Sequence, residues 1–301
     1  MDDLPYAPGW PEAQATPALP PPELVASDDV RYPERLTDLR DPPSGLWSIG
    51  DWNVLDAPVV AVVGTRRATS YGLRVTRDLV GALARAGACI VSGMALGIDA
   101  AAHRAALDAG GRTVAVLGTG VDVAYPRSHR ALHAELGFKG LLLSELPPGA
   151  HSHGGSFPMR NRIIAAIARL TIVVEAPVKS GALITANHAL DLTRDVAIVP
   201  GPIDSPQSRG SNDLLRDGAH PIASIADALS LAGLAPQRRG ELAIEDDVEL
   251  RIWSALEQGA ASLDELCARS ALPVSTCLTA ITALELRGVV ECALTGEVRR
   301  R

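Results

Sequence analysis

Two glycine-containing turns carry side chains of the kinds that bind phosphate. The segment 64–67 (GTRR) follows an apolar run and offers a tight turn, a hydroxyl group and guanidinium groups just before a helix. The segment 179–181 (KSG) offers an ammonium and a hydroxyl group at the start of another helix. Guanidinium groups and the free N–H groups at a helix start donate hydrogen bonds to phosphate oxygens. For either turn alone, solvated cations are the alternative interpretation. The predicted phosphate-binding residues are Gly64, Thr65, Arg66, Arg67, Lys179, Ser180 and Gly181.

A third cationic segment stands at the entrance to a hydrophobic run. Arg160, Asn161 and Arg162 directly precede the apolar sequence IIAAIA, and no acidic residue follows them until Glu175. A buried arginine is costly unless it is paired. Either a carboxylate from elsewhere in the chain or a ligand phosphate must therefore face these arginines. Three cationic segments on one sheet edge would form a site that binds several phosphates.

The segment 92–99 (SGMALGID) is expected near the same site. Gly93 and Gly97 let the backbone approach a ligand or a neighbouring strand closely. Asp99 and His103 lie on the helix that follows, and we expect structural roles for both, with Asp99 as a cap that interacts with the helix dipole. Tyr125 either stacks on a base or ends a loop.

The sequence lacks the motifs of common nucleotide-dependent and hydrolytic enzymes. It contains no G-x-G-x-x-G, G-x-x-x-x-G-K-[ST] or H-E-x-x-H. Its four cysteines are scattered, and the histidines of the segment 151–156 (HSHGGS) are expected to be solvated rather than to bind metal. We therefore expect a binding protein without catalytic residues, cofactor or metal. The carboxylates near the predicted turns occur singly; they are Asp99, Asp122, Glu145 and Glu175.

Alternating strands and helices must position these turns. Short β-branched runs that end in glycine are typical of buried parallel strands, and apolar residues every three to four positions are typical of helices. The alternation predicts an α/β fold with a doubly wound, mostly parallel sheet whose carboxyl strand ends share one edge. The phosphate-binding turns should meet there. Strands are expected at 58–65, 88–93, 113–118, 141–145, 170–176 and 196–201, helices at 71–87, 97–111, 127–137, 160–168 and 182–195, and a closing segment at 220–233.

The last fifth of the chain predicts a separate small domain. Residues 234–246 have no hydrophobic periodicity and are expected to form a linker. In residues 247–301, three short amphipathic helices precede two short strands around Thr295 and Gly296, which is a winged-helix pattern. Ser262 and Glu265 have the spacing of a capping box.

Charge is distributed unevenly along the chain, whose net charge is −7. Residues 1–30 contain six acidic residues, seven prolines and no basic residue, which predicts a disordered leader. Residues 241–301 contain 11 acidic and 6 basic residues, whereas residues 31–240 contain 18 acidic and 22 basic residues. A mildly basic central domain, predicted over residues 31–233, is compatible with a polyanionic ligand. No segment has the pattern of a signal peptide or a membrane span, so we expect a cytoplasmic protein.

Seven segments occur in a fixed order within about residues 31–225: VAVVGTRRATSYG, VSGMALGIDAAAH, VLGTGVDVAYP, SELPPG, GSFPMRNRIIAAIA, VVEAPVKSGALITANHAL and VPGPIDSPQSRGSNDLLRDGA. In these segments and their order the chain resembles the DNA-processing protein A family (DprA, also called Smf). The resemblance implies an extended Rossmann-like domain that binds single-stranded DNA (ssDNA) and forms a homodimer. It also implies a role in natural transformation (competence) and DNA recombination, in which the protein protects incoming ssDNA, loads the RecA recombinase onto it and helps to displace single-strand-binding protein.

The resemblance also assigns roles to individual residues. It implies that Phe157 contacts a base or a sugar. We expect that at least one of Arg160 and Arg162 pairs with a DNA phosphate, and that the other pairs with a buried carboxylate such as Glu175. The full predicted nucleic-acid-binding set is Gly64, Thr65, Arg66, Arg67, Gly93, Gly97, Gly155, Ser156, Phe157, Arg160, Asn161, Arg162, Lys179, Ser180, Gly181 and Thr185.

The chain departs from the family pattern in several places, one of which is His129, where many members have asparagine. Some members have a lysine just before the GSF sequence, where this chain has glycine, and His151 and His153 replace that charge partly when they are protonated. Many members have an N-terminal helical domain in place of residues 1–30. The last helix of the winged-helix domain offers serine, threonine, glutamate and Arg287, so we expect it to contact protein rather than to read duplex DNA.

A nucleotide-binding enzyme or sensor is the alternative interpretation. The LOG-type phosphoribohydrolases also have an R-N segment, followed by a strand and the motif P-G-G-x-G-T-x-x-E, whose glutamate is catalytic. When Thr185 is aligned with the threonine of that motif, His188 takes the place of the glutamate. The missing carboxylate favours ssDNA binding without hydrolysis.

Overall fold

The computed structural model describes residues 19–235, 246–286, 289–293 and 296–300. The chain divides into two compact units, residues 1–236 and 237–301. The division falls within the predicted linker, whose residues 236–245 lie outside the described ranges.

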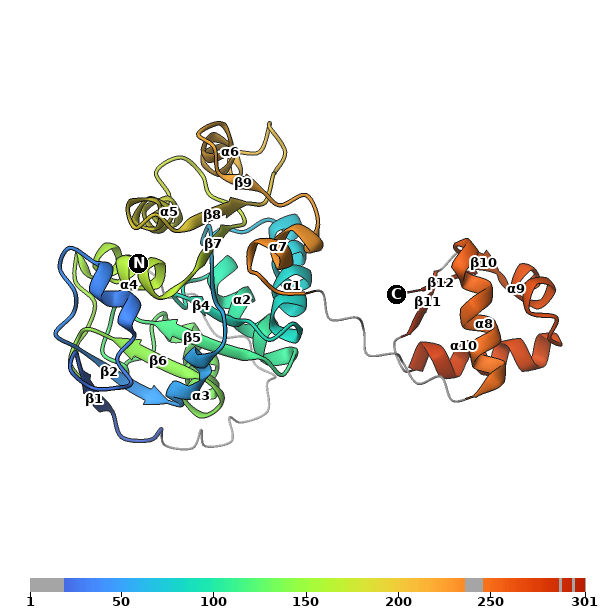
Figure 1. Cartoon of the computed structure of the whole chain (residues 1–301), viewed down its shortest axis with the longest axis horizontal. Coiled ribbons are helices and arrows are strands. Elements are labelled where there is room, and N and C mark those ends of the chain that lie inside the picture. Colours follow the sequence, from blue (N-terminus) through green and yellow to red (C-terminus); the bar gives the residue numbers. More distant parts are fainter. Residues whose placement is uncertain (1–18, 236–245, 287–288, 294–295, 301) are drawn as a thin grey trace, which may run out of the picture. The chain divides into compact units, whose positions relative to one another are not determined.

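A nine-stranded sheet forms the centre of the first unit (Figure 1). Its spatial order is β1-β2-β6-β5-β4-β3-β7-β8-β9. The strands from β6 to β9 in this order are parallel, whereas β2 is antiparallel to both β1 and β6. The prediction of a doubly wound, mostly parallel sheet is therefore confirmed. The strands are β1 (Glu23–Ala26), β2 (Gly45–Gly50), β3 (Val59–Val63), β4 (Cys89–Ser92), β5 (Arg112–Val116), β6 (Leu141–Ser144), β7 (Leu170–Val173), β8 (Asp195–Ile198) and β9 (His220–Pro221).

The direction of winding reverses between β3 and β7. From β3 the chain proceeds outward through β4, β5 and β6, and it then crosses back to β7 on the other side of β3. At such a switch point the loops after the two central strands diverge and leave a crevice at the carboxyl ends of the strands. The loops that follow Val63 and Val173 therefore frame the place where a ligand is expected.

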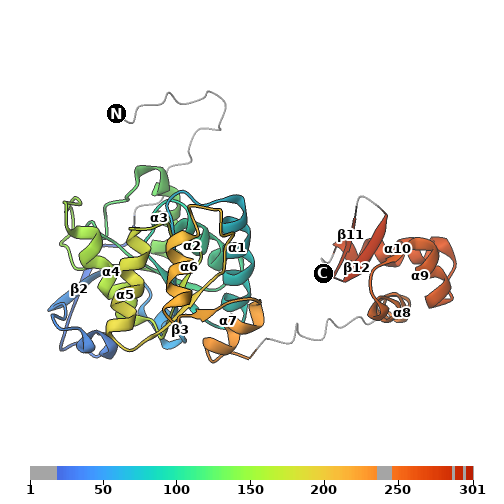
Figure 2. The same cartoon turned by 90° about the horizontal axis from the view of Figure 1, so that it is seen from above.

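Helices cover both faces of this sheet (Figures 1 and 2). Helices α1, α2 and α7 pack on the face that carries Val60, Val62 and Ile90. Helices α4 and α5 lie side by side on the opposite face, which carries Ala61 and Val91. Successive strand residues point to opposite faces, so fully apolar strands supply both layers. The helices are α1 (Ser70–Arg85), α2 (Ile98–Asp108), α3 (Arg130–Lys139), α4 (Ser156–Ile167), α5 (Gly181–Asp191), α6 (Arg209–Arg216) and α7 (Ile225–Leu231), with the 3-10 helices η1 (Glu34–Asp38), η2 (Trp52–Asp56) and η3 (Arg127–His129).

The predicted disordered leader, residues 1–30, is too long. Residues 23–26 form β1, which pairs with β2 at the edge of the sheet. Val25 is fully buried, and Arg31 forms ion pairs with Glu23 and Asp29. A strand of four residues behind three consecutive prolines gives too short a pattern for recognition in the sequence. Residues 1–18 lie outside the described ranges.

The second unit is a winged-helix domain, as predicted. Its helices pack around a core that includes Ile252, Leu266 and Cys277. Ser262 and Glu265 form the predicted capping box at the start of α9. The elements are α8 (Asp247–Ala255), η4 (Leu256–Gln258), α9 (Leu263–Ser270), α10 (Val274–Leu286) and a sheet in the order β10 (Ala261–Ser262), β12 (Glu297–Arg300) and β11 (Val290–Cys292).

Within the described ranges, no single helix has the length and hydropathy needed to cross a membrane. Two consecutive helical segments, Leu263–Ser270 and Val274–Glu285, have the required length and hydropathy only when they are taken together. Their axes are bent by 106° at the break between them. Leu266 and Cys277, from these two helices, are core residues of the winged-helix domain.

Candidate nucleic-acid interface

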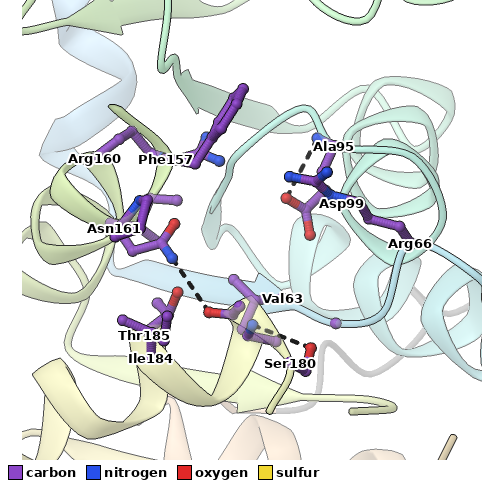
Figure 3. A pocket seen from close by; sticks show the side chains of 15 residues that line it. Val63, Arg66, Ala95, Asp99, Phe157, Arg160, Asn161, Ser180, Ile184 and Thr185 are labelled. Carbon is purple, nitrogen blue, oxygen red and sulfur yellow. Dashed lines mark hydrogen bonds between the residues drawn. The ribbon is translucent and has the colours of Figure 1, made fainter. Parts of the chain in front are cut away.

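A pocket of about 390 Å³ opens at the switch point between β3 and β7 (Figure 3). The turn after β3, the start of α2, helix α4 and the start of α5 supply its walls. We call it the Arg160 pocket. Segments more than 100 residues apart converge here because the carboxyl ends of the parallel strands share one edge. The predicted residues that line it are Gly64, Arg66, Phe157, Arg160, Asn161, Ser180, Gly181 and Thr185.

Arg160 is the buried cation of this pocket. Its guanidinium donates to the backbone carbonyl of Val116 on β5, and its Nε has no hydrogen-bond partner among the described residues. Burial lowers the pKa of Arg160 to about 10, while the negative charge of Asp99 opposes this fall. Arg160 is therefore charged at neutral pH. Because its side chain lines an open pocket, an anionic ligand in that pocket can pair with it.

Asp99 also lines this pocket, and its charge interacts with that of Arg160. Its Oδ2 accepts the N–H groups of Gly93 and Ala95, at 3.2 and 3.4 Å, in the turn after β4. Burial raises the pKa of the Asp99 carboxyl, whereas the Arg160 charge and these N–H groups oppose the rise. The predicted role of Asp99 as the helix cap is wrong, because Gly97 is the N-cap of α2 and no side chain caps it. Asp99 lies in the first turn of α2 and lines the Arg160 pocket.

An arginine and two aromatic rings form the rim of the pocket. The guanidinium carbon of Arg66 lies 5.4 Å from the centre of the Phe157 ring. The rings of Phe157 and Tyr125 are 5.3 Å apart and inclined by 36°. Arg66 and Tyr125 are exposed, and Phe157 is half-buried. An exposed cation beside aromatic surface can hold a phosphate and an adjacent base together.

The floor joins α4 to the start of α5. Asn161 donates from Nδ2 to the carbonyl oxygen of Gly181 at 3.2 Å. Ser180 is the N-cap of α5 and accepts the N–H of Ala182 at 3.3 Å, and Thr185 is buried one turn further on. Helix α5 begins at the predicted place, directly behind Ser180. Figure 3 shows the α4 side chains on one side of the pocket and Arg66 with Asp99 on the other.

Thr65 fixes the turn after β3 and is not part of the pocket lining. Its Oγ1 lies 3.0 Å from Gln207 Oε1 and accepts the N–H of Arg67. Its carbonyl oxygen accepts the N–H of Ile98 at 3.3 Å. Gly97 has a φ of +79°, and a Cβ there would lie 2.3 Å from the Thr65 carbonyl oxygen. The close approach predicted for Gly97 is therefore made to a neighbouring turn.

The structure contradicts the predicted place of Arg162. Its guanidinium donates to both oxygens of Glu145, at 2.7 and 2.8 Å, and to the carbonyl of Asp41, at 2.6 Å. Arg160 and Arg162 are two residues apart on α4, so their side chains leave the helix in nearly opposite directions. One arginine enters the pocket, and the other anchors α4 to the segment before β2.

Glu175, the carboxylate expected to pair with an arginine, caps α1 instead. It is 1% exposed, and it accepts the N–H of Thr69 at 2.9 Å and the Thr69 hydroxyl at 2.5 Å. Gly72 leaves room for the carboxylate, since a Cβ there would lie 2.3 Å from Glu175 Oε2. The buried charge is thus satisfied at a helix N-terminus.

Further predicted residues lie outside the pocket lining. Arg67 and Lys179 are exposed, and Lys179 has a φ of +65° in the turn before α5. Gly155 is the N-cap of α4. Ser156 lines an adjoining cavity of about 180 Å³, and Gly93 lies against the Arg160 guanidinium.

The apolar part of the lining was not predicted from the sequence; it includes Val63, Ala95, Ile164 and Ile184. Such residues carry no polar signal that distinguishes them from the core. The place of Asp99 in the lining was indicated by one feature of the sequence, because it is a single acidic residue directly after a glycine-rich turn. Within the described ranges, no three or more His, Cys, Asp or Glu side chains gather as a group that could hold a metal ion.

Comparisons with protein families agree with this architecture. Residues 23–233 match the family model of DNA recombination-mediator protein A, and residues 235–293 match the DprA winged helix domain. The family match begins at Glu23, the first residue of β1, and therefore includes residues that were predicted to belong to a disordered leader.

Curated relatives cover most of the chain. It is 43% identical over 260 residues to the putative DNA processing protein DprA of Mycobacterium tuberculosis, with 83% of this chain and 67% of that protein covered. It is 43% identical to the protein Smf of Synechocystis over 71% of this chain, but spans only 55% of that protein.

Two solved structures share the fold. The DprA structure from Streptococcus pneumoniae is 40% identical, with a TM-score of 0.67, and the match covers 71% of this chain and 75% of that one. The structure from Helicobacter pylori, described for its single-stranded DNA binding mode, is 33% identical, with a TM-score of 0.64, and the match covers 69% of this chain and 94% of that one. Sequence motifs, sheet topology and both family models agree, and the chain belongs to the DNA recombination-mediator protein A family, the DprA/Smf proteins.

Proposed function

We propose that this chain binds single-stranded DNA through the Arg160 pocket and acts, without catalysis, in natural transformation and recombination in the cytoplasm. The observation that carries the proposal is the combination of Arg66, Phe157 and Arg160 at one opening: an exposed cation, an aromatic ring and a buried cation. Phosphate contacts and stacking on aromatic rings are the two components of sequence-tolerant ssDNA binding. The ssDNA binding mode described for the Helicobacter pylori relative adds support.

A nucleotide enzyme is the weaker candidate. Asp99 is the carboxylate among the pocket-lining residues, and it is engaged with two backbone N–H groups and faces Arg160. His188, which takes the place of the catalytic glutamate of LOG-type enzymes, is not part of the pocket lining. A carboxylate that is held in this way suits the positioning of a cation better than proton transfer to a substrate.

Family membership supports the partners that we propose. We infer that the chain delivers its ssDNA to RecA, displaces single-strand-binding protein and acts as a homodimer. RecA-catalysed strand exchange on DNA coated with single-strand-binding protein tests the first two steps. Sedimentation velocity tests the dimer.

We also propose that the winged-helix domain contacts protein rather than duplex DNA. Its helix α10 exposes the apolar side chains of Val274 and Leu278, about half of whose surfaces are accessible. The hydroxyl groups of Thr279 and Thr282 donate to carbonyl oxygens of their own helix. The guanidinium carbon of Arg300 lies 4.1 Å from the centre of the Trp253 ring, so this cation is engaged within the domain. A helix that reads base edges would instead present free donors and acceptors. Arg287 lies outside the described ranges.

Fluorescence anisotropy with a labelled strand of about 35 nucleotides tests the central proposal. The comparison includes the duplex, a mononucleotide competitor, two salt concentrations and the variants Arg66→Ala and Arg67→Ala. These two arginines are adjacent and both exposed, but Arg67 is not part of the pocket lining, so it is a matched control. We expect salt-dependent preference for the single strand, with a loss of about tenfold or more for Arg66→Ala and about twofold or less for Arg67→Ala.

Two results would overturn this function. Equal affinity for single strand and duplex would remove the selectivity that the pocket is proposed to provide. Displacement of the strand by micromolar mononucleotide would instead indicate a nucleotide enzyme or sensor.

A further inference from the structure

The loop between β8 and α6, residues 199–208, reaches the turn that carries Arg66. The hydroxyl group of Thr65 donates its hydrogen to Oε1 of Gln207 at 3.0 Å, although the two residues are 142 positions apart in the chain. Neither residue lines the Arg160 pocket, but Thr65 directly precedes Arg66, which does. The hydrogen bond therefore joins a loop that does not line the pocket to the backbone of a residue that does.

Gln207 sets the direction of the Thr65 hydroxyl group. A hydroxyl group has one hydrogen to donate and two lone pairs that accept. Because Thr65 donates this hydrogen to Gln207, a lone pair of the same oxygen is left to accept the N–H of Arg67, at 3.2 Å. The backbone N–H of Thr65 donates to the carbonyl oxygen of Glu175 at 2.7 Å, and its carbonyl oxygen accepts the N–H of Ile98 at 3.3 Å. The backbone of this turn is thus held from several directions.

The side chain of Arg66 has no hydrogen bond and no ion pair within the described ranges. Its guanidinium carbon lies 5.4 Å from the centre of the Phe157 ring, and it extends from the turn on the side of the pocket opposite Asn161 (Figure 3). An arginine has many rotamers, so holding it near its bound geometry reduces the entropy that is lost when a phosphate binds. The approach of Arg66 to Phe157 therefore depends on the backbone that Thr65 fixes.

The loop between β8 and α6 can serve as a rigid support because its two ends are joined. The backbone N–H of Gly201 donates to Oδ1 of Asn212 at 3.2 Å, and the Gly201 carbonyl oxygen accepts from Nδ2 of the same side chain at 3.0 Å. Ser208 is fully buried, and a Cβ at Gly201 would overlap its hydroxyl group. Gln207 directly precedes Ser208, so its amide is presented to Thr65 from a closed loop.

We propose that Gln207 is a positioning residue for ssDNA binding, which acts through Thr65 to hold Arg66 beside Phe157. The inference rests on the proposed ssDNA function and adds to it a residue outside the pocket lining. Gln207 carries no charge, so its replacement removes an acceptor and leaves the charge of the site unchanged. Because it acts through one arginine, its loss should remove one phosphate contact.

Gln207→Met is the test variant, because methionine keeps the length of the side chain and lacks the amide. The matched control is Tyr71→Phe, which removes the hydrogen bond that Tyr71 donates to the carbonyl oxygen of Pro200 in the same loop, at 2.9 Å. That bond leads to the first turn of α1 and not to the turn that carries Arg66. Anisotropy with a labelled strand of about 35 nucleotides at several salt concentrations compares both variants, alone and combined with Arg66→Ala. Urea unfolding checks the fold of each protein.

We expect Gln207→Met to weaken ssDNA binding about threefold to tenfold and to reduce the salt slope by about 0.7, which corresponds to one phosphate contact. When it is combined with Arg66→Ala, it should cause no further loss, because the residue through which it acts is already absent. Tyr71→Phe should match the wild type in affinity and in salt slope. Thr65→Val breaks the same hydrogen bond from its other end, so it should reproduce the loss and the smaller slope.

Three results would overturn this role of Gln207. The first is wild-type affinity and salt slope in folded Gln207→Met and Thr65→Val proteins. The second is an equal loss for Tyr71→Phe, since the whole loop rather than Gln207 would then be required. The third is an undiminished loss when Gln207→Met is added to Arg66→Ala, since Gln207 would then act independently of Arg66. If Arg66→Ala alone left ssDNA binding unchanged, the proposed function itself would fail.

Discussion

Arg162 and Glu145 form a bidentate ion pair, with both oxygens within 2.8 Å of one guanidinium nitrogen. This ion pair gives Arg162 a structural role. Arg160, two residues earlier on α4, lines the pocket instead. The side chains of the pair are 13% and 29% exposed, so the ion pair is mostly removed from water. Its loss should affect the fold and not the ligand.

Replacement of Arg162 by alanine should therefore lower the free energy of unfolding by about 1 to 3 kcal/mol, because Glu145 and the Asp41 carbonyl lose their partner. The ssDNA affinity of the folded protein should change by about twofold or less, whereas Arg160→Ala should reduce it by about tenfold or more. Urea unfolding and anisotropy measure the two quantities. Similar losses of affinity for both variants, with intact folds, would contradict this division.

Gly93 should be required for ligand binding because of the space that it leaves. A Cβ at this position would lie 2.2 Å from Nη1 of Arg160, so Gly93→Ala should displace the guanidinium from its place in the pocket. Gly154→Ala is the matched control, since nothing lies within 4 Å of a Cβ there. We expect a loss of ssDNA affinity of about tenfold for Gly93→Ala and none for Gly154→Ala. If the Gly93→Ala protein folded and kept wild-type affinity, the place of the Arg160 guanidinium against Gly93 would not be required for ssDNA binding.

Much of the site follows from the sequence because the sheet is parallel. β-branched runs that end in glycine identify strands β3, β4 and β5, and a fully apolar run identifies β7. Parallel topology requires the turns after these strands to share one edge. The convergence of Gly64, Phe157 and Ser180 was predictable for this reason, although the three segments are far apart in the chain.

The choice of partners within the site does not follow from the sequence. The preference of Arg162 for Glu145 depends on the direction of α4 relative to β6, which no local pattern specifies. The capping of α1 by Glu175 depends on the neighbourhood of β3 and β7. The edge strand β1 escaped prediction because four residues, half of them exposed, carry too little hydrophobic periodicity.

His103 should make the fold sensitive to acid. It is fully buried, its Nδ1 lies 2.8 Å from Thr113 Oγ1, and its Nε2 has no partner among the described residues. Burial and the nearby charge of Arg160 lower its pKa to about 3, from an ordinary value of 6.5. Below pH 6.5 the unfolded chain binds a proton that the folded protein excludes until about pH 3. The contribution of His103 is thus fully present above pH 6.5 and is lost as the pH falls toward 3.

Urea unfolding between pH 7 and pH 4 measures this effect. The stability of the wild type should fall more steeply than that of His103→Gln, by about 1.4 kcal/mol per pH unit below pH 6.5. Comparison with the variant removes the contributions of other titrating groups, such as Asp99. Parallel stability profiles for the two proteins would show that His103 titrates normally in the folded state.

Gly154 stands just before the GSF sequence, and it is one of the two glycines, Gly154 and Gly155, at which the family resemblance implies a lysine in some members. Nothing lies within 4 Å of a Cβ at this position, and Gly155, which follows, is the N-cap of α4. A lysine there would have room to extend toward the rim formed by Phe157 and Arg66. Gly154→Lys should therefore strengthen ssDNA binding about threefold to tenfold, and the salt slope should grow by about 0.7 because one phosphate contact is added.

Gly154→Gln has nearly the same length without the charge, so it should leave both quantities unchanged. If Gly154→Lys and Gly154→Gln had the same affinity and the same salt slope in anisotropy titrations at several salt concentrations, no phosphate would pass this position, and the strand would have to approach the rim from the side of Tyr125 instead.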